Sequence, residues 1–193
     1  MSMTVKLLRS LRRDGLARTI VRCFQYPRIH LRLEKLQRAL STRDPRVIFS
    51  TIHDANLWSD QESVSGPGSS LEYTKNLRER LPRLLQEFGV QKLYDAPCGD
   101  FNWMREVDLQ TQPVEYHGAD VVSRIIDNNR VRFAGPLRRF DVADIISSPF
   151  PAAGMWFCRD CLFHFSYADI FRTLSVAGQQ DPRESDGRAV ADG

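Results

Sequence analysis

The stretch Leu93-Tyr-Asp-Ala-Pro-Cys-Gly-Asp100 decides the fold class of this 193-residue chain. Its first part is a short apolar run that predicts a buried strand over residues 92–96, and its proline and glycine then end that strand in a turn. A glycine in such a turn lets the backbone approach a ligand closely. The carboxylates of Asp95 and Asp100 would repel a pyrophosphate and favour a ligand with a cationic end.

The residues after this stretch repeat its rhythm of short apolar runs separated by helical segments. Strands are expected at residues 92–96, 115–120, 137–142 and 155–159, with helices at 71–88, 103–107, 123–131 and 167–174. Parallel neighbours need long crossover connections, which these helices supply. The pattern therefore predicts an α/β fold, a doubly wound and mostly parallel Rossmann-like sheet of about four strands.

Charge and composition divide the chain into three parts. Residues 1–46 hold 12 Lys and Arg against 3 Asp and Glu and read as a basic helical arm, whereas residues 47–175 carry the α/β pattern. Residues 176–193 contain no Leu, Ile, Phe, Tyr or Trp. A segment of that composition cannot bury enough apolar area to offset its ordering entropy, so a disordered tail is expected there.

The basic arm has two interpretations. Lys and Arg side chains near acidic phosphates gain Coulomb energy, so the arm could contact an anionic membrane surface or nucleic acid. Charge runs are more often solvated faces, which favours a helical arm that packs on its own domain. We therefore expect no nucleic acid partner and keep peripheral membrane contact as the alternative.

The chain has the features of a cytoplasmic protein. No apolar run approaches the roughly 18 residues of a membrane span, and the N-terminus lacks the apolar core of a signal peptide. The four cysteines are then expected to be reduced thiols rather than a disulfide framework. Nothing in the sequence indicates the oligomeric state.

Carboxylates stand at the ends of three expected strands, where ligands bind in an open α/β sheet. Asp95 ends the first strand, and Asp120 closes the second 25 residues later, where an acidic side chain is placed to bind ribose hydroxyls. Asp141, on the third strand, could accept a hydrogen bond from an exocyclic amine such as that of adenine. Together the three residues favour a nucleoside with an amino acid end.

The quoted stretch resembles motif I of class I S-adenosylmethionine-dependent methyltransferases, and Cys158-Arg-Asp-Cys-Leu-Phe-His164 resembles the motif that follows their fourth strand. Residues 56–74 also resemble a bacterial subgroup of that superfamily whose substrate is unknown. The resemblance covers roughly residues 52–175. The first and third glycine positions of motif I are occupied here by Pro97 and Phe101.

The resemblance implies S-adenosylmethionine as the cofactor and assigns residues to its parts. Asp95 and Gly99 would line the methionine end, Asp120 the ribose, and Asp141 with Val142 the adenine. The cofactor-binding set that it implies also includes Ala96, Cys98, Val121 and Cys158. The implied activity is methyl transfer to an unidentified small-molecule or glycan acceptor.

Asp160 and His164 are the candidates for acid/base chemistry. Methyl transfer is an in-line attack on a sulfonium carbon, so a protein adds positioning and removal of the nucleophile's proton. His164 could take that proton, although a structural role for this histidine is equally compatible with the sequence. Cys158, Cys161 and His164 have zinc-ligand spacing, but strand alternation would point neighbouring ligands apart, so no metal is expected.

A complete fold of this class has seven strands, and the chain offers no apolar run for the last three. We therefore expect a C-terminally truncated fold that binds the cofactor weakly or not at all, and whose catalysis is doubtful. The alternative function is a non-catalytic binding or scaffold protein with a basic arm. A nicotinamide dehydrogenase is disfavoured because no Gly-x-Gly-x-x-Gly follows the first strand.

Overall fold

The computed structural model describes residues 29–109 and 113–178, which form parts of two compact units, Met1–Thr51 and Ile52–Gly193. In the first unit residues 29–42 are helical, and helix α2 (Pro45–Asp54) runs across the boundary. The division thus falls after Thr51, whereas the sequence predicted it after residue 46. Most of the predicted basic arm, residues 1–28, lies outside the described residues, as does the predicted tail from residue 179 onward.

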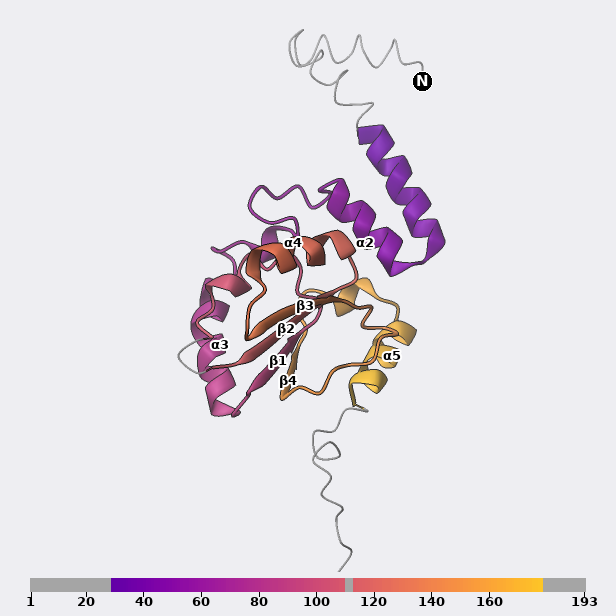
Figure 1. Cartoon of the computed structure of the whole chain (residues 1–193). Helices are drawn as coiled ribbons and strands as arrows, with labels where there is room; N and C mark the ends of the chain where they lie inside the picture. The colour runs from indigo at the N-terminus through magenta and orange to yellow at the C-terminus, as the bar shows by residue number, and fades with distance from the viewer. Residues whose placement is uncertain (1–28, 110–112, 179–193) are drawn as a thin grey trace, which may run out of the picture. The chain divides into compact units, whose positions relative to one another are not determined.

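The second unit is built on one parallel sheet (Figure 1). Its strands are β1 (Lys92–Asp95), β2 (Glu115–Asp120), β3 (Arg138–Val142) and β4 (Met155–Phe157). The spatial order is β3-β2-β1-β4, and every pairing is parallel. This is the beginning of the doubly wound order 3-2-1-4, so the predicted fold class is confirmed. The bounds of β2 agree with the sequence prediction, and β4 ends two residues early.

Helices alternate with the strands along the chain. They are α3 (Lys75–Glu87), α4 (Ser123–Phe133) and α5 (Tyr167–Gly178), with single 3-10 turns η1 (Pro67–Ser69), η2 (Met104–Glu106) and η3 (Leu162–His164). α3 begins four residues later than predicted, because residues 71–74 form turns that precede it. α3 contains Pro82, and it is followed by Gly89 at φ +61°.

α5 extends past its predicted end at Leu174 and reaches Gly178. Val176 and Ala177 pack against buried residues under the sheet, so the predicted start of the tail at residue 176 is wrong. The predicted cap is present: the Ser166 hydroxyl accepts a hydrogen bond from the Asp169 amide at 3.2 Å and donates one to its carboxylate at 2.7 Å. The Ser166 hydroxyl therefore caps the first turn of α5.

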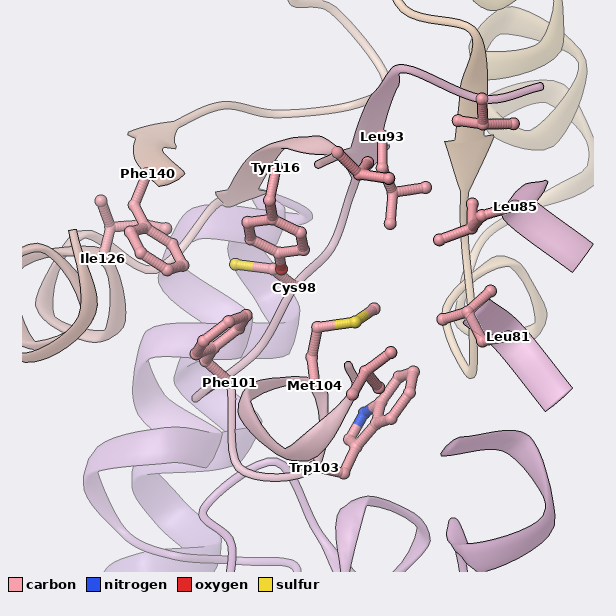
Figure 2. Close-up of a cluster of buried hydrophobic side chains, with 13 residues drawn as sticks. Leu81, Leu85, Leu93, Cys98, Phe101, Trp103, Met104, Tyr116, Ile126 and Phe140 are labelled. Carbon is pink, nitrogen blue, oxygen red and sulfur yellow. The ribbon is translucent and has the colours of Figure 1, made fainter. Parts of the chain in front are cut away.

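The core has two layers, one on each face of the sheet. One layer contains large apolar side chains from strands, helices and the loop after β1: Leu81, Leu85, Leu93, Phe101, Met104, Tyr116, Ile126 and Phe140 (Figure 2). The other layer contains Tyr94, Ala96, Ala119, Ile145, Phe150 and Cys161. Successive residues of a strand point to opposite faces, so Leu93 and Tyr94 belong to different layers. Both faces of the central strands are buried, as parallel sheets require.

Candidate functional site

The carboxyl ends of β1 and β2 place two buried carboxylates on neighbouring strands. Asp95 is 3% exposed and accepts a hydrogen bond from the Tyr116 hydroxyl. Asp120 is 7% exposed, and its two oxygens accept from the backbone amides of Gly99 at 3.1 Å and Val122 at 2.9 Å. The loop after β1 and the turn after β2 are therefore joined through Asp120.

Asp95 is a buried acid that no cation touches within the described residues. Burial raises the pKa of its carboxyl to about 7; the Tyr116 hydrogen bond opposes that rise, the charge of Asp120 adds to it, and Arg159 opposes it from a distance. No ion pair between described residues includes Asp95. A cationic ligand beside it would favour the ionised form and lower the pKa.

Asp120 differs from Asp95 because backbone amides already donate hydrogen bonds to its carboxylate. Burial raises the pKa of Asp120, and the amides of Val122 and Gly99 oppose that rise. A carboxylate has about four lone-pair sites, so two remain after these two amides. Asp120 can therefore order both loops and still accept hydrogen bonds from a ligand's hydroxyls.

The loop after β1 is held firmly to its surroundings. The Cys98 amide donates to the Ala119 carbonyl at 2.8 Å, and the Asn129 side chain on α4 donates to the Gly99 carbonyl at 2.8 Å. Burial raises the pKa of the Cys98 thiol well above its ordinary value, so this cysteine is protonated at neutral pH. Ala96 is fully buried, and its carbonyl accepts from the indole of Trp156 at 2.9 Å.

Phe101 occupies a position where motif I has glycine, and its backbone keeps the glycine-like conformation at φ +60°. This conformation is unfavourable for a residue with a side chain, so packing around the residue must offset its cost. The Phe101 ring is almost fully buried and lies 5.0 Å from the Tyr116 ring and 5.2 Å from the Phe140 ring, centre to centre (Figure 2). Packing of the ring therefore holds Phe101 in this turn conformation.

Residues 56–70, here named the covering segment, lie on the loop after β1. The carboxylate of Asp100 accepts hydrogen bonds from the Ser63 hydroxyl at 2.9 Å, the Val64 amide at 3.0 Å and the Ser65 hydroxyl at 3.2 Å. The Asp100 amide donates back to Ser65 at 2.9 Å. Asp100 is thus committed to the covering segment, and our interpretation of it as a receptor for a cationic ligand is wrong.

Arg159, just after β4, holds the covering segment from the other side. Its guanidinium donates to the Gly68 carbonyl at 2.7 Å and pairs with Asp160 at 2.8 Å. The same group lies over the rings of Tyr73 and Trp103, at 5.7 and 5.6 Å from their centres. The covering segment therefore contacts the loops that follow both β1 and β4.

The two candidates for acid/base chemistry lie beside this segment. Asp160 has φ +52° and is paired with Arg159, so its carboxylate is already engaged. The His164 ring lies 6.5 Å from the Trp58 ring, centre to centre. Burial lowers the pKa of His164 and the charge of Asp160 raises it, with burial the larger effect. A neutral imidazole of this kind can accept a proton near pH 7.

Cys158 and Cys161 follow β4 and interact with each other. A hydrogen bond between the thiols lowers the pKa of Cys158 and raises that of Cys161. Both belong to the core layer around Tyr94 or pack against it. Within residues 29–109 and 113–178, no group of three or more His, Cys, Asp or Glu side chains is arranged to hold a metal ion.

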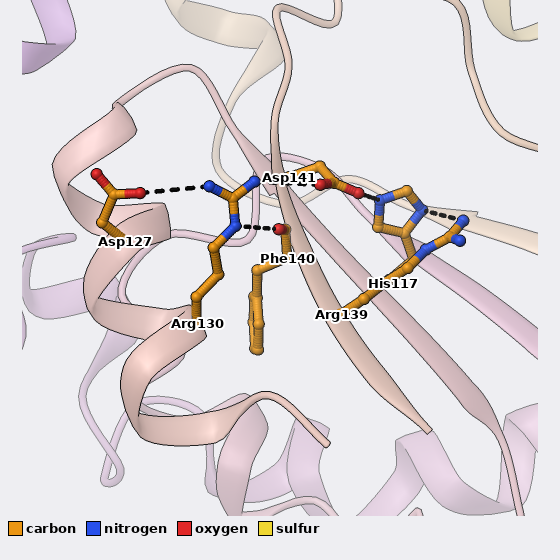
Figure 3. Close-up of polar contacts among 6 residues, drawn as sticks. All are labelled: His117, Asp127, Arg130, Arg139, Phe140 and Asp141. Atoms are coloured by element: carbon orange, nitrogen blue, oxygen red, sulfur yellow. Dashed lines mark hydrogen bonds and ion pairs between the residues drawn. The ribbon is translucent and has the colours of Figure 1, made fainter. Parts of the chain in front are cut away.

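Asp141 is not gathered with Asp95 and Asp120. Its carboxylate contacts the His117 Nε2 at 2.9 Å and the Arg130 guanidinium at 3.1 Å (Figure 3). Tyr116 reaches Asp95 from one face of β2, and the next residue, His117, reaches Asp141 from the opposite face. The three predicted carboxylates thus do not form one cluster.

Two residues of the predicted set remain near the end of β2. Val142 is the residue of β3 directly opposite Asp120, and it is 46% exposed. Val121 is partly exposed in the turn after Asp120. Both valines could contact a flat apolar group beside the strand ends, whereas the carboxylate of Asp141 is occupied.

Several contacts of this site carried no signal in the sequence. Ser63 and Asp100 are 37 residues apart, and Arg159 and Gly68 are 91 apart. No local pattern marks such contacts, because they depend on how the strands are ordered in the sheet. The strand order itself would have suggested them, since it places the loops after β1 and β4 side by side.

Among the described residues, none of the helices has the length and apolar character needed to span a bilayer. No protein-family model matches the chain, and no curated protein matches it. The solved structures that are similar to it include two methyltransferases, each with 14% sequence identity. One is human N-acetylserotonin methyltransferase in complex with SAM. The match covers 90% of this chain and 48% of that chain, with a TM-score of 0.48.

The second similar structure is magnesium protoporphyrin IX methyltransferase from Synechocystis PCC 6803 with bound SAH. The match covers 55% of this chain and 51% of that one, with a TM-score of 0.42. The chain thus spans about half the length of each solved structure. The fold assignment rests on the strand order and direction of the sheet.

Proposed function

We propose that this chain binds S-adenosylmethionine and transfers its methyl group to a small-molecule or glycan acceptor. The observation that carries the proposal is the buried pair Asp95 and Asp120 at the carboxyl ends of adjacent parallel strands. Burying an acid without a cation is costly, and such perturbed acids mark functional sites. S-adenosylmethionine would offer Asp95 a cationic amino acid end and offer Asp120 ribose hydroxyls.

The residues of the site fit the cofactor part by part. Asp95 would hold the methionine end, with Ala96, Cys98 and Gly99 forming the adjoining loop. Asp120 would accept from the ribose through its remaining lone pairs, and Val121 and Val142 would flank the adenine. Asp141 would contact the adenine amine only if its present bonds to His117 and Arg130 were given up.

The cofactor, when bound, supplies an electrophilic methyl group, and the chain supplies position and proton acceptance. Under this proposal neutral His164 accepts the proton of the acceptor's nucleophilic group. Asp160 acts through Arg159, whose guanidinium holds the covering segment over the strand ends. Cys158, the first residue after β4, lies in the same loop.

Calorimetric titration with S-adenosylmethionine and S-adenosylhomocysteine tests the proposal. Asp120→Ala removes the ribose acceptor and is expected to weaken binding about tenfold or more, because hydrogen bonds to a charged group are worth roughly 1.5–3 kcal/mol. Asp127→Ala, an exposed acid on α4, is the matched control and should bind as the natural sequence does. Equal affinities in both variants would refute the assignment of Asp120.

The competing function, a non-catalytic binding protein, is favoured by the net charge of +9 on residues 1–46. It predicts that the full chain binds anionic vesicles or nucleic acid with an affinity that falls steeply as salt rises. It also predicts no heat of binding with S-adenosylmethionine. Vesicle and nucleic acid titrations at two salt concentrations, run beside the calorimetry, separate the two functions.

A further inference from the structure

A groove of about 250 Å³ lies at the opposite end of the sheet from Asp95 and Asp120. Its lining includes the first residues of three strands, Lys92, Glu115 and Arg138, together with Tyr94, His117 and Arg139. Segments 135–137 and 151–153 complete it. Because Asp95 and Asp120 are the last residues of β1 and β2, the groove is separate from the site proposed for the cofactor.

Arg138 and Arg139 line this groove and pair with no carboxylate among the described residues; the Arg138 guanidinium lies over the Phe101 ring, 5.5 Å from its centre. Lys92 pairs with Glu115 at 3.5 Å, and Asp141 pairs with Arg130 at 3.1 Å. Among the ion pairs of the described residues none includes Arg139, and its one hydrogen bond there goes to the Nδ1 atom of His117 at 3.0 Å (Figure 3). The groove therefore carries an excess positive charge.

The contact between Arg139 and His117 fixes the state of the imidazole. A guanidinium can only donate, so Nδ1 must be the acceptor, and Nε2 then carries the proton that is donated to Asp141 at 2.9 Å. His117 is thus neutral and cannot compensate the charge of Arg139. Burial and the charge of Arg139 also lower the pKa of His117.

Tyr94 also lines this groove. It is 2% exposed, and its ring packs against the rings of His117 and Phe150 at 5.1 and 5.3 Å, centre to centre. Its hydroxyl has no hydrogen-bond partner among the described residues. Burial raises the pKa of Tyr94 to about 12, and the nearby charges of Asp141 and Asp95 add to that rise, so the hydroxyl keeps its proton and can donate it.

We infer that this groove binds the oxyanion group, phosphate or carboxylate, of a small molecule. Arg139 would supply the charge and the planar donors, and Tyr94 would supply the second donor. One oxyanion could accept hydrogen bonds from both side chains. The planar N–H groups of an arginine match the geometry of phosphate and carboxylate oxygens. The inference does not depend on the proposed function, because none of these residues belongs to the cofactor site.

The test is a titration of the full chain with inorganic phosphate and with acetate, followed by NMR. The amide signals of Gly135 and Arg139 and the ring signals of His117 should shift saturably with at least one of the two anions. Chloride at matched ionic strength corrects for screening. The anion that binds more tightly identifies the oxyanion as phosphate or carboxylate.

Three variants locate the binding. Arg139→Gln should weaken it about tenfold or more, and Tyr94→Phe about two- to tenfold, as expected for a charged and a neutral donor. Arg83→Gln, an exposed arginine on α3, should leave the affinity unchanged. The inference is overturned if neither anion gives shifts beyond those of chloride up to about 50 mM, or if Arg139→Gln binds as the natural sequence does.

Discussion

At the scale of single residues, Asp95 is the residue on which the proposed cofactor site most depends. A carboxyl that is 3% exposed and has only the Tyr116 hydroxyl as a partner is not optimised for stability. Asp100 is the contrast, because it lies only five residues away and its carboxylate accepts bonds from three residues of the covering segment. Local sequence does not distinguish these two acids, since their partners are distant in the chain.

Gly99 is required for two independent physical reasons. Its φ of +57° favours glycine, and a Cβ atom there would lie 2.4 Å from the Ser65 hydroxyl. That hydroxyl bonds to Asp100 and cannot move without breaking both of its contacts. Gly99→Ala is therefore expected to cost more than the roughly 1–2 kcal/mol of the left-handed conformation alone. The free energy of unfolding measured with urea checks this.

Two other glycines separate the cost of the backbone conformation from the cost of the clash with Ser65. Gly89 has φ +61° with nothing within 4 Å of a Cβ atom, so Gly89→Ala measures the conformational cost alone. Gly135 has neither a left-handed backbone nor a close neighbour, so Gly135→Ala should be close to neutral. The order of destabilisation is expected to be Gly99, then Gly89, then Gly135. Equal losses of unfolding free energy for Gly99→Ala and Gly89→Ala would show that the Ser65 side chain moves aside at little cost.

At the scale of elements, the strands were predicted from the sequence better than the helices. β2 has the predicted bounds, because its residues alternate faces and end at an acid, which is a strong local signal. The start of α3 was misplaced because residues 71–74, which were predicted to be helical, form turns that precede the helix. The end of α5 was misplaced because Val176 and Ala177 pack under the sheet, a contact that composition does not reveal.

The covering segment depends on Asp100, and this dependence can be measured. Asp100→Ala removes the acceptor for Ser63, Val64 and Ser65 together and leaves their donors without this partner. Hydrogen exchange at the Val64 amide is expected to accelerate strongly, because its acceptor is lost. Stability should fall by about 1–3 kcal/mol. Asp127→Ala, on the exposed side of α4, is the control, and equal exchange rates at Val64 in both variants would contradict this account of the covering segment.

At the scale of the whole sheet, one end carries acidic side chains and the other end carries a basic side chain. The carboxyl ends of β1 and β2 hold Asp95 and Asp120, and the amino-end groove holds the unneutralised Arg139. The sequence predicted the first pair, because acids at the ends of parallel strands must share an edge. It did not separate Asp141 from that pair, since a one-residue difference in strand position sends a side chain to the other face.

The pH dependence of cofactor binding tests the central claim. In the free chain the pKa of Asp95 is raised to about 7, and a cationic ligand favours its ionised form. Binding must then release a proton at low pH, so affinity rises with pH and levels off above the pKa. Between pH 6.0 and 7.5 the ionised fraction grows roughly eightfold, and the affinity should grow with it.

Calorimetric titration of S-adenosylmethionine across that pH range, on the natural sequence and on Asp95→Asn, is the most direct measurement. The account predicts binding that strengthens roughly eightfold for the natural sequence, and weaker binding without this pH dependence for Asp95→Asn. Binding that is absent from the natural sequence at every pH, or that is equally strong and equally pH-dependent in the variant, would contradict it.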